Sequence, residues 1–408
     1  MRSERNVMQM SNELEFSLDG IEARELVGAV PGLVHEVNPK DIVELNVSLA
    51  PDISGLNRMV DEQVRGLIAT TESRGGRIYG GASLLANVSS VEPARYRTTS
   101  ISDSCGRGFL DITSQQIVLG VGEEQLGFDL YNFFRQINPV LLALSASSPF
   151  RLRNGSIEDT DFASRRIEQY ERLCRYFPGS MWREMPEIHS LEEYSGHLRA
   201  ISDEVNRGLL DGIFDANWEE LKRVRTKGST EFSHYPFSRL EPHQIYWFIR
   251  VRPDHRNIES GGSSLFSLEL RVPDIPTTIQ RMQMINSFVV GLAYYIADNG
   301  DDVPTSALTG SFGELRNTAA RGLDAEIGGV GIRYLADSLR GYSARGLESR
   351  GYTREAQMMV SIAENILHYG NDASLIRELN PMDPTELRGY LITRLREGEL
   401  WGHEDTYT

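Results

Sequence analysis

The sequence predicts an α+β protein in which a largely antiparallel sheet is backed by helices. Segments with strand-like alternation are mixed with helical segments over 12–275, whereas 276–408 shows helical periods alone. Hydrophobic residues make up 40% and charged residues 25% of the 408 residues, which is typical of a globular protein. No repeat or long Pro/Ser-rich linker separates the two portions. We therefore expect one catalytic domain over 1–408, with the helical portion packed on the sheet-rich portion.

Each element follows from the spacing of its apolar residues. Within 41–49, Val43, Leu45 and Val47 alternate with polar residues, which is typical of a strand with two unlike faces. Within 56–72, apolar residues recur every three or four positions, which is typical of a helix. The expected strands are 14–18, 41–49, 117–121, 245–252 and 265–272. The expected helices are 56–72, 129–145, 165–177, 191–210, 278–297, 313–324, 332–339, 353–369 and 384–397.

The charge balance excludes several classes of partner. Asp and Glu number 58 against 42 Lys and Arg, which gives a formal charge of −16. Nucleic acids and anionic membranes select a basic surface, so neither is an expected partner. No apolar run approaches the roughly 20 residues that span a bilayer, and 1–16 lacks the apolar core of a secretory signal. We expect a soluble, cytoplasmic protein whose two cysteines, Cys105 and Cys174, are buried thiols.

A scan for catalytic motifs removes the commonest chemistries. The sequence contains no GxxxxGK[ST] phosphate loop, and its glycines at 75, 76, 80 and 81 do not form GxGxxG. HExxH, CxxC and GxSxG are also absent. Zinc, thiol and serine-hydrolase mechanisms are therefore disfavoured.

Carboxylates and arginines on predicted strands remain as candidates. Glu13 and Glu15 are two residues apart, as are Glu269 and Arg271, so each pair shares one face of its strand. Glu44 lies in a strand between two apolar residues. Hard oxygen ligands beside an arginine suit Mg²⁺-nucleotide chemistry. The alternative for any single pair is a solvated strand face.

Several blocks together resemble a known family. The segment 138–150, NPVLLALSASSPF, resembles the signature of the glutamate–cysteine ligase type 2 family, also called carboxylate–amine ligases. The resemblance runs from about residue 12 to about residue 380. Other blocks similar to the family occur in its order, namely ELEF at 13–16, IVELN at 42–46, SRR at 164–166, WFIR at 247–250, LELRVPD at 268–274 and AARGLD at 319–324.

The resemblance implies a glutamine-synthetase-like fold, in which a curved antiparallel sheet forms an active-site funnel. It also implies a reaction: ATP phosphorylates a carboxylate, usually the γ-carboxylate of glutamate, and an amine attacks the acyl phosphate. The implied cofactors are ATP and Mg²⁺, and the implied partners are small amino acid and amine substrates. Such chemistry depends on positioning and charge neutralisation more than on a protein nucleophile.

The resemblance also assigns roles to individual residues. Arg271 is implied to contact the transferring phosphoryl group as the catalytic arginine. The residues implied to bind ATP or substrate are Arg250, Arg321 and Arg165. The residues implied to hold Mg²⁺ are Glu13, Glu15, Glu44, Gln116 and Glu269. For each arginine the alternative is a structural ion pair.

One departure from the family pattern leaves the function open. Many bacterial members have HVHVGV where this chain has 116–121, QIVLGV, so both histidines are missing. Gln116 retains a carbonyl oxygen for Mg²⁺, but Val118 cannot coordinate a metal. The site therefore binds fewer groups at one metal, uses another substrate, or no longer catalyses. In the last case the chain is a ligase-derived nucleotide or amino-acid binding protein. A purely structural scaffold would leave the strand carboxylates without a role. The amine acceptor and a homo-oligomeric state are not determined by the sequence.

Overall fold

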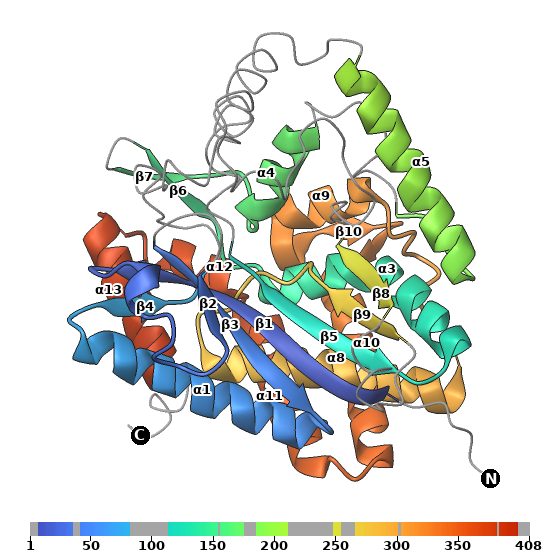
Figure 1. Ribbon diagram of the computed structural model, residues 1–408, viewed down its shortest axis with the longest axis horizontal. Coiled ribbons are helices and arrows are strands. Elements are labelled where there is room, and N and C mark those ends of the chain that lie inside the picture. The colour runs from blue at the N-terminus through green and yellow to red at the C-terminus, as the bar shows by residue number, and fades with distance from the viewer. Residues whose placement is uncertain are drawn as a thin grey trace.

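A seven-stranded sheet forms the centre of the computed structural model (Figure 1). All its pairings are antiparallel, which confirms the predicted α+β class. Its strand order is β2-β3-β1-β5-β9-β8, and β4 pairs with β1. The strands are β1 (Val7–Asp19), β2 (Leu33–His35), β3 (Ile42–Ala50), β4 (Arg77–Tyr79), β5 (Gln115–Val121), β8 (Ile249–Pro253) and β9 (Phe266–Leu270). The structure describes residues 7–35, 41–81, 113–153, 156–174, 185–210, 248–253, 266–300, 303–381 and 383–398.

Strand register gives the sheet one apolar and one polar face. Leu14 of β1 lies opposite Leu45 of β3, whereas the next residue, Glu15, lies opposite Glu44. Directly opposite residues point to the same side of a sheet, and successive residues point to opposite sides. The apolar side chains are fully buried, so this face belongs to the core.

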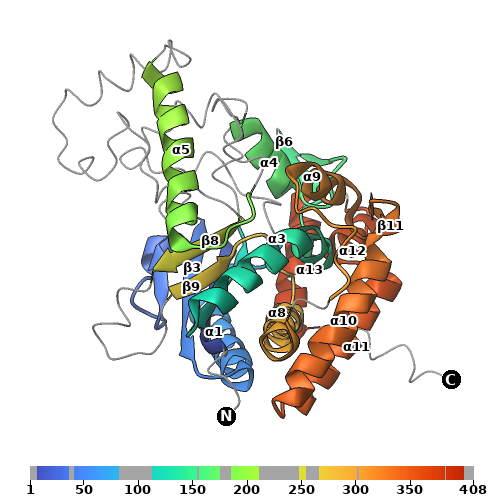
Figure 2. The same ribbon diagram turned by 90° about the vertical axis from the view of Figure 1, so that its right-hand side faces the viewer.

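Three long helices cover the apolar face. They are α1 (Ile53–Ser73), α3 (Glu124–Ser145) and α8 (Ile279–Asn299), and each contacts strands of the sheet. Two further helices, α10 (Ile332–Ser349) and α11 (Thr353–Tyr369), pack on the other side of α8 (Figure 2). The helix α8 is buried on most sides, including the polar residues Arg281, Asn286 and Ser287, because it lies between these layers.

The contact between α8 and α10 depends on two glycines. A Cβ atom added to Gly346 would lie 1.9 Å from the carbonyl oxygen of Gly291. Neither position accommodates a larger residue at this separation of the two backbones. Helix α10 therefore continues ten residues beyond its predicted end at 339, to Ser349, because packing against α8 outweighs the low helix propensity of glycine.

Smaller elements complete the described structure. The helices are α4 (Arg165–Cys174), α5 (Leu191–Leu210), α9 (Phe312–Arg321), α12 (Asp372–Glu378) and α13 (Pro384–Glu397). The short helical turns are η1 (Ala23–Glu25) and η6 (Gly322–Asp324). The two hairpins are β6 (Phe150–Arg153) with β7 (Ser156–Asp159), and β10 (Glu326–Ile327) with β11 (Val330–Gly331). The Tyr194 hydroxyl of α5 accepts a 3.1 Å hydrogen bond from the Val251 amide, which ties α5 to β8.

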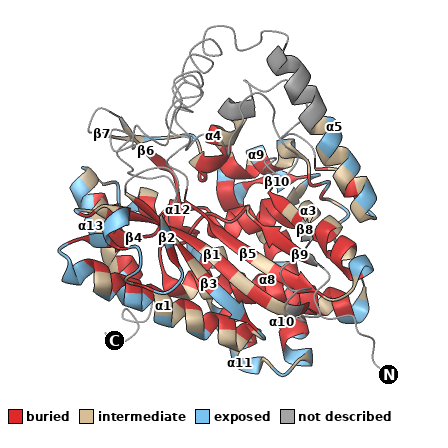
Figure 3. Cartoon of the chain, viewed as in Figure 1, coloured by how far each residue is buried: buried red, intermediate tan, exposed pale blue. Residues whose placement is uncertain are grey.

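The main hydrophobic cluster draws on both portions of the chain. It includes Val7 at one end of the sequence and Leu395 at the other, and Figure 3 shows the buried residues concentrated in the sheet and α8. The prediction of one domain over 1–408 stays a prediction. Within the described ranges, no helix is both long and apolar enough to cross a membrane. Cys105, Trp247, the Cys174 side chain and the outer parts of three expected elements (175–177, 245–247 and 265) lie outside the described residues.

Candidate active site

The polar face of the sheet brings together the five residues predicted to bind Mg²⁺. Glu15 of β1 lies opposite Glu44 of β3, and Glu13 lies opposite Gln116 of β5. Glu269 of β9 lies opposite Val118, which shares a face with Gln116 because they are two residues apart. Five side chains from four neighbouring strands therefore point to one side of the sheet.

Glu15 lies at the centre of the carboxylate group. Its side chain is 7% exposed, and its two oxygens accept hydrogen bonds from the Ser114 hydroxyl at 2.8 Å and the Gln116 amide at 3.1 Å. Burial, with a smaller contribution from the neighbouring charge of Glu44, raises the pKa of Glu15 to about 7 against the opposing effect of the Ser114 hydrogen bond. Such a carboxylate is stabilised by a bound cation.

Two arginines flank the buried Glu269 carboxylate. Glu269 is fully buried, and Arg271 Nη1 lies 2.8 Å from its Oε1 atom. Arg250 Nη1 lies 3.8 Å from the other oxygen, Oε2. Burial favours loss of the Arg271 proton, but the charges of Glu269, Glu15 and Glu13 outweigh burial and raise the pKa of Arg271. Arg271 therefore lies, fully charged, beside Glu269 and is stabilised by the charges of Glu15 and Glu13.

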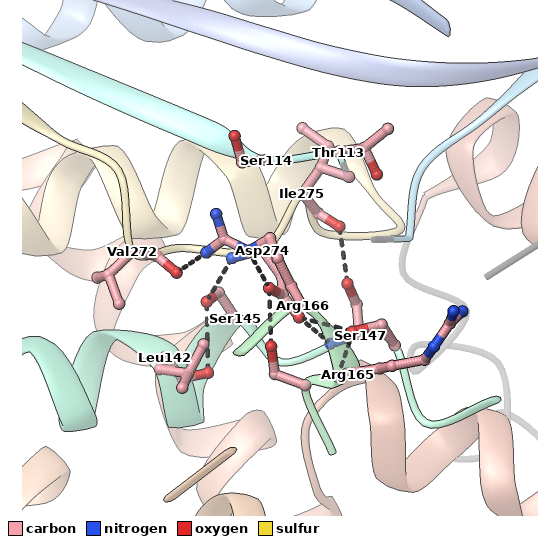
Figure 4. Close-up of polar contacts among 12 residues, drawn as sticks. Thr113, Ser114, Leu142, Ser145, Ser147, Arg165, Arg166, Val272, Asp274 and Ile275 are labelled. Carbon is pink, nitrogen blue, oxygen red and sulfur yellow. Dashed lines mark hydrogen bonds and ion pairs between the residues drawn. The ribbon is translucent and has the colours of Figure 1, made fainter. Parts of the chain in front are cut away.

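The structure places the two other predicted arginines on the helices α4 and α9. Arg165 is the first residue of α4, and its backbone amide bonds the Ser148 hydroxyl at 3.0 Å. In Figure 4 the Arg165 guanidinium extends away from Asp274. Arg321 is exposed at the end of α9, and no hydrogen bond or ion pair links it to the sheet within the described part of the chain. Their predicted roles in ATP or substrate binding stay predictions.

Arg166, which sequence reasoning did not select, is buried beside the cluster. It is 1% exposed, and its Nε atom lies 2.9 Å from Asp274 Oδ1 (Figure 4). Its Nη1 and Nη2 atoms donate to the carbonyls of Arg271, at 2.8 Å, and Val272. Arg166 thus fixes the backbone that carries Arg271. In the sequence, only its place as the second arginine of the Ser-Arg-Arg block pointed to Arg166. Tertiary packing alone distinguishes it from Arg165.

The serines of the signature segment hold Asp274 in place. Ser148 Oγ and the Ser147 amide each bond Asp274 Oδ2 at 3.2 Å, and the Asp274 amide donates to Ser145 Oγ at 3.1 Å. Ser164 Oγ donates to Oδ1 at 3.0 Å. Burial raises the pKa of Asp274, whereas Arg166 and these hydrogen bonds oppose that effect. These serines thus connect the end of α3 to the segment that follows β9 and Arg271.

The residues of the polar face fit a Mg²⁺ ion that arrives with phosphates. Gln116 is 2% exposed, and its Oε1 atom has no hydrogen-bond partner among the residues that the structure describes. A buried amide oxygen that accepts no hydrogen bond from these residues, and lies beside Glu15, is a suitable ligand for a hard cation. Over the same residues, no three His, Cys, Asp or Glu side chains converge closely enough to hold a metal by themselves. Mg²⁺ commonly takes only one or two carboxylates, with phosphates and water completing its shell.

Helix α13 contacts the far end of the same face. Tyr79 of β4 lies opposite Ser17, two residues beyond Glu15, and it is hydrogen-bonded to Arg388 of α13. Arg388 also lies 3.9 Å from Asp19. Tyr79 packs with Leu387 and Leu391 in a small separate cluster. The C-terminal helices therefore close this end of the polar face.

Comparisons with known proteins identify the relatives of this chain. The sequence model of the glutamate-cysteine ligase family 2 matches residues 4–334. A protein of Bordetella avium (strain 197N), whose assignment as glutamate–cysteine ligase 2 is provisional, is 23% identical over 355 residues, which cover 83% of this chain and 72% of that protein.

Two solved structures share the fold. One is a glutamate–cysteine ligase from Francisella tularensis in complex with AMP, with a TM-score of 0.58 and 11% identity, covering 97% of this chain and 90% of that one. The other is a bifunctional glutathione synthetase from Pasteurella multocida, with a TM-score of 0.57 and 12% identity, covering 97% of this chain and 52% of that one. At these identities the likeness shows the fold, in agreement with the predicted curved antiparallel sheet.

Proposed function

Because the chain belongs to the glutamate-cysteine ligase family 2, it is a carboxylate–amine ligase of that type, and we propose that it uses ATP and Mg²⁺ to join a glutamate γ-carboxylate to an amine. The observation that carries this proposal is the register of the sheet. That register places Glu15 beside Glu44, and Glu269 beside Arg250, on one face. Carboxylates that hold a metal and arginines that neutralise phosphates are the groups that phosphoryl transfer requires.

The proposed reaction has two steps. A carboxylate oxygen of the substrate attacks the γ-phosphorus of ATP, and the bond to the leaving ADP oxygen breaks. The nitrogen of the amine then attacks the acyl carbon, inorganic phosphate leaves, and the amine loses a proton. The products are an amide, ADP and phosphate.

Each residue of the polar face has a part in these steps. Glu13, Glu15, Glu44, Gln116 and Glu269 would hold Mg²⁺, which neutralises phosphate charge when bound. Arg271 would contact the phosphoryl group in transfer, and its hydrogen bond to Glu269 at 2.8 Å keeps the guanidinium oriented. Arg250 would bind a phosphate or the substrate carboxylate.

Val118 supports a second candidate function. Its apolar side chain lies directly opposite Glu269, at the centre of the face where phosphate and metal would bind. A site with fewer ligands at this point is consistent with a protein that binds a nucleotide or an amino acid without joining anything.

The two functions differ in a turnover assay. ADP and phosphate release is measured with ATP, Mg²⁺ and L-glutamate, with and without a panel of amines that includes L-cysteine. We expect release that requires both glutamate and one amine. Nucleotide binding without turnover on any amine would favour the binding function.

Two variants test the assignment of the site. Glu269→Gln keeps the shape of the side chain but removes its charge, so we expect turnover to fall by at least 100-fold while the circular dichroism spectrum is retained. Glu348→Gln is the matched control, because Glu348 is exposed on α10, a helix layer away from the sheet. Equal activity of the two variants would refute the role of Glu269.

A further inference from the structure

A narrow cleft beside α3 contains a buried amide group that has no hydrogen-bond partner among the described residues. The cleft lies between α3, the start of β8 and the start of α9, and it encloses about 240 Å³ including the solvent at its mouth. Its innermost part has room for about one water molecule. Most of its lining is apolar, from Met185, Phe248, Phe312 and Leu315.

The lining includes two polar side chains, Ser311, whose hydroxyl caps α9 by accepting from the Glu314 amide, and Asn138. Asn138 is 1% exposed, and neither its Oδ1 nor its Nδ2 atom has a hydrogen-bond partner among the described residues. A buried amide without partners costs about 1–3 kcal/mol, so leucine at this position would make a more stable protein. Asn132 lies six residues earlier in the same helix, and both atoms of its amide are paired. Its Nδ2 donates to the Ile188 carbonyl at 2.8 Å, and its Oδ1 accepts from the Ile188 amide at 3.0 Å.

The cleft adjoins the arginine end of the polar face through Phe248. The Phe248 ring lines the cleft, and its carbonyl accepts a 2.7 Å hydrogen bond from the Arg271 amide. The same ring meets Tyr170 edge-to-face, with 5.3 Å between ring centres. Tyr170 in turn interacts electrostatically with Arg271. Phe248 and Tyr170 therefore connect the cleft to the arginine that we place on the phosphoryl group.

We propose that this cleft binds the side chain of the amine acceptor, with Asn138 as its specificity-determining residue. This inference rests on the proposed ligase function and names the acceptor class. The acceptor is a small primary amine with a short, mainly apolar side chain that ends in a hydrogen-bonding group such as a hydroxyl. The apolar walls exclude a charged or bulky side chain, and the amide offers one acceptor and two donor hydrogens to the end group.

The test compares two amines of equal size. Ethanolamine ends in a hydroxyl and n-propylamine ends in a methyl group, and the binding of each is measured by calorimetry and by thermal unfolding. We expect the wild-type protein to bind ethanolamine at least tenfold more tightly, because losing the partner of a buried polar group is costly. In Asn138→Leu this preference should disappear, while the unfolding temperature without amine stays equal or rises.

Asn132→Leu is the matched control. It removes the two hydrogen bonds to Ile188, so we expect a lower unfolding temperature with the amine preference retained. If Asn138→Leu does not fold, Asn138→Ala provides the same comparison of amines. Equal binding of the two amines by the wild-type protein, or an unchanged preference in the Asn138 variant, would overturn the proposal.

The failure of this proposal and that of the ligase function are distinguishable. The amine comparison measures binding and does not require turnover. Absence of glutamate-dependent ADP release would contradict the ligase function, whereas the amine comparison by itself decides whether the cleft recognises a hydroxyl.

Discussion

Removal of the Arg166 guanidinium should strongly destabilise the fold, while removal of the neighbouring Arg165 should not. Arg166 is 1% exposed and forms a 2.9 Å ion pair with the fully buried Asp274. Arg166→Met leaves the Asp274 carboxylate buried without its counter-charge. It also removes a donor from the carbonyls of Arg271 and Val272.

The magnitude follows from the burial of the pair. Removing one partner of a buried ion pair lowers the free energy of unfolding by about 3–5 kcal/mol. The entropy of unfolding is about 2 cal/mol/K per residue, which gives roughly 0.9 kcal/mol/K for 408 residues that unfold together. The midpoint of thermal unfolding should therefore fall by about 3–6 °C in Arg166→Met.

The assay is differential scanning calorimetry of both methionine variants and of Arg166→Lys. Arg165→Met should shift the midpoint by about 1 °C or less, because Arg165 is only half-buried whereas Arg166 is 1% exposed. Arg166→Lys keeps the charge but cannot bond Asp274 and both carbonyls together, so we expect an intermediate loss. Equal shifts for the two methionine variants would refute the role given to Arg166.

Three further predictions test the site and the core. Arg271→Lys should lower kcat at least tenfold with little change in stability, because lysine keeps the charge but not the planar fork; unchanged kcat in steady-state kinetics would remove Arg271 from the mechanism. Gly346→Ala should destabilise the protein by at least 2 kcal/mol in a denaturant titration, since its Cβ would lie 1.9 Å from the Gly291 carbonyl oxygen, and a neutral result would contradict the close packing of α8 and α10. In metal-free protein, a Glu15 pKa raised from 4.5 to about 7 means that the folded state binds this proton more tightly than the unfolded state. The stability that this proton binding contributes is fully present below pH 4.5 and is lost as the pH rises to about 7. Glu15→Gln should therefore stabilise the protein at pH 8, by up to about 3 kcal/mol, but not at pH 4.5. Parallel pH profiles of wild type and variant in chelator would contradict this.

Elements with strong local periodicity could be predicted closely. The segments 353–369 and 384–397 coincide with α11 and α13, and 41–49 differs from β3 by one residue at each end. Their apolar spacing is a local property of the chain. The short elements α12, β2 and β4 were not predicted, because they depend on distant partners. Asp372 of α12, for example, accepts hydrogen bonds from the Thr277 amide and hydroxyl at 2.8 Å.

The composition of the candidate site could also be predicted, but its pairing could not. Residues two apart on a strand share a face whatever the fold, so Glu13 was expected beside Glu15, and Glu269 beside Arg271. That Glu15 lies opposite Glu44, and Glu269 opposite Arg250, depends on the register between strands. A shift of one residue would turn one member of each pair into the core.

The sequence by itself determined the fold class, the family resemblance and the set of charged residues on the polar face. Only the tertiary structure decided which member of the Arg165–Arg166 pair is buried, and that the Asn138 amide lines a cleft. Consecutive residues on a helix point about 100° apart, so one of two adjacent arginines can face the core. Which one does so depends on how α4 packs against 271–274, a contact between segments more than 100 residues apart in the chain.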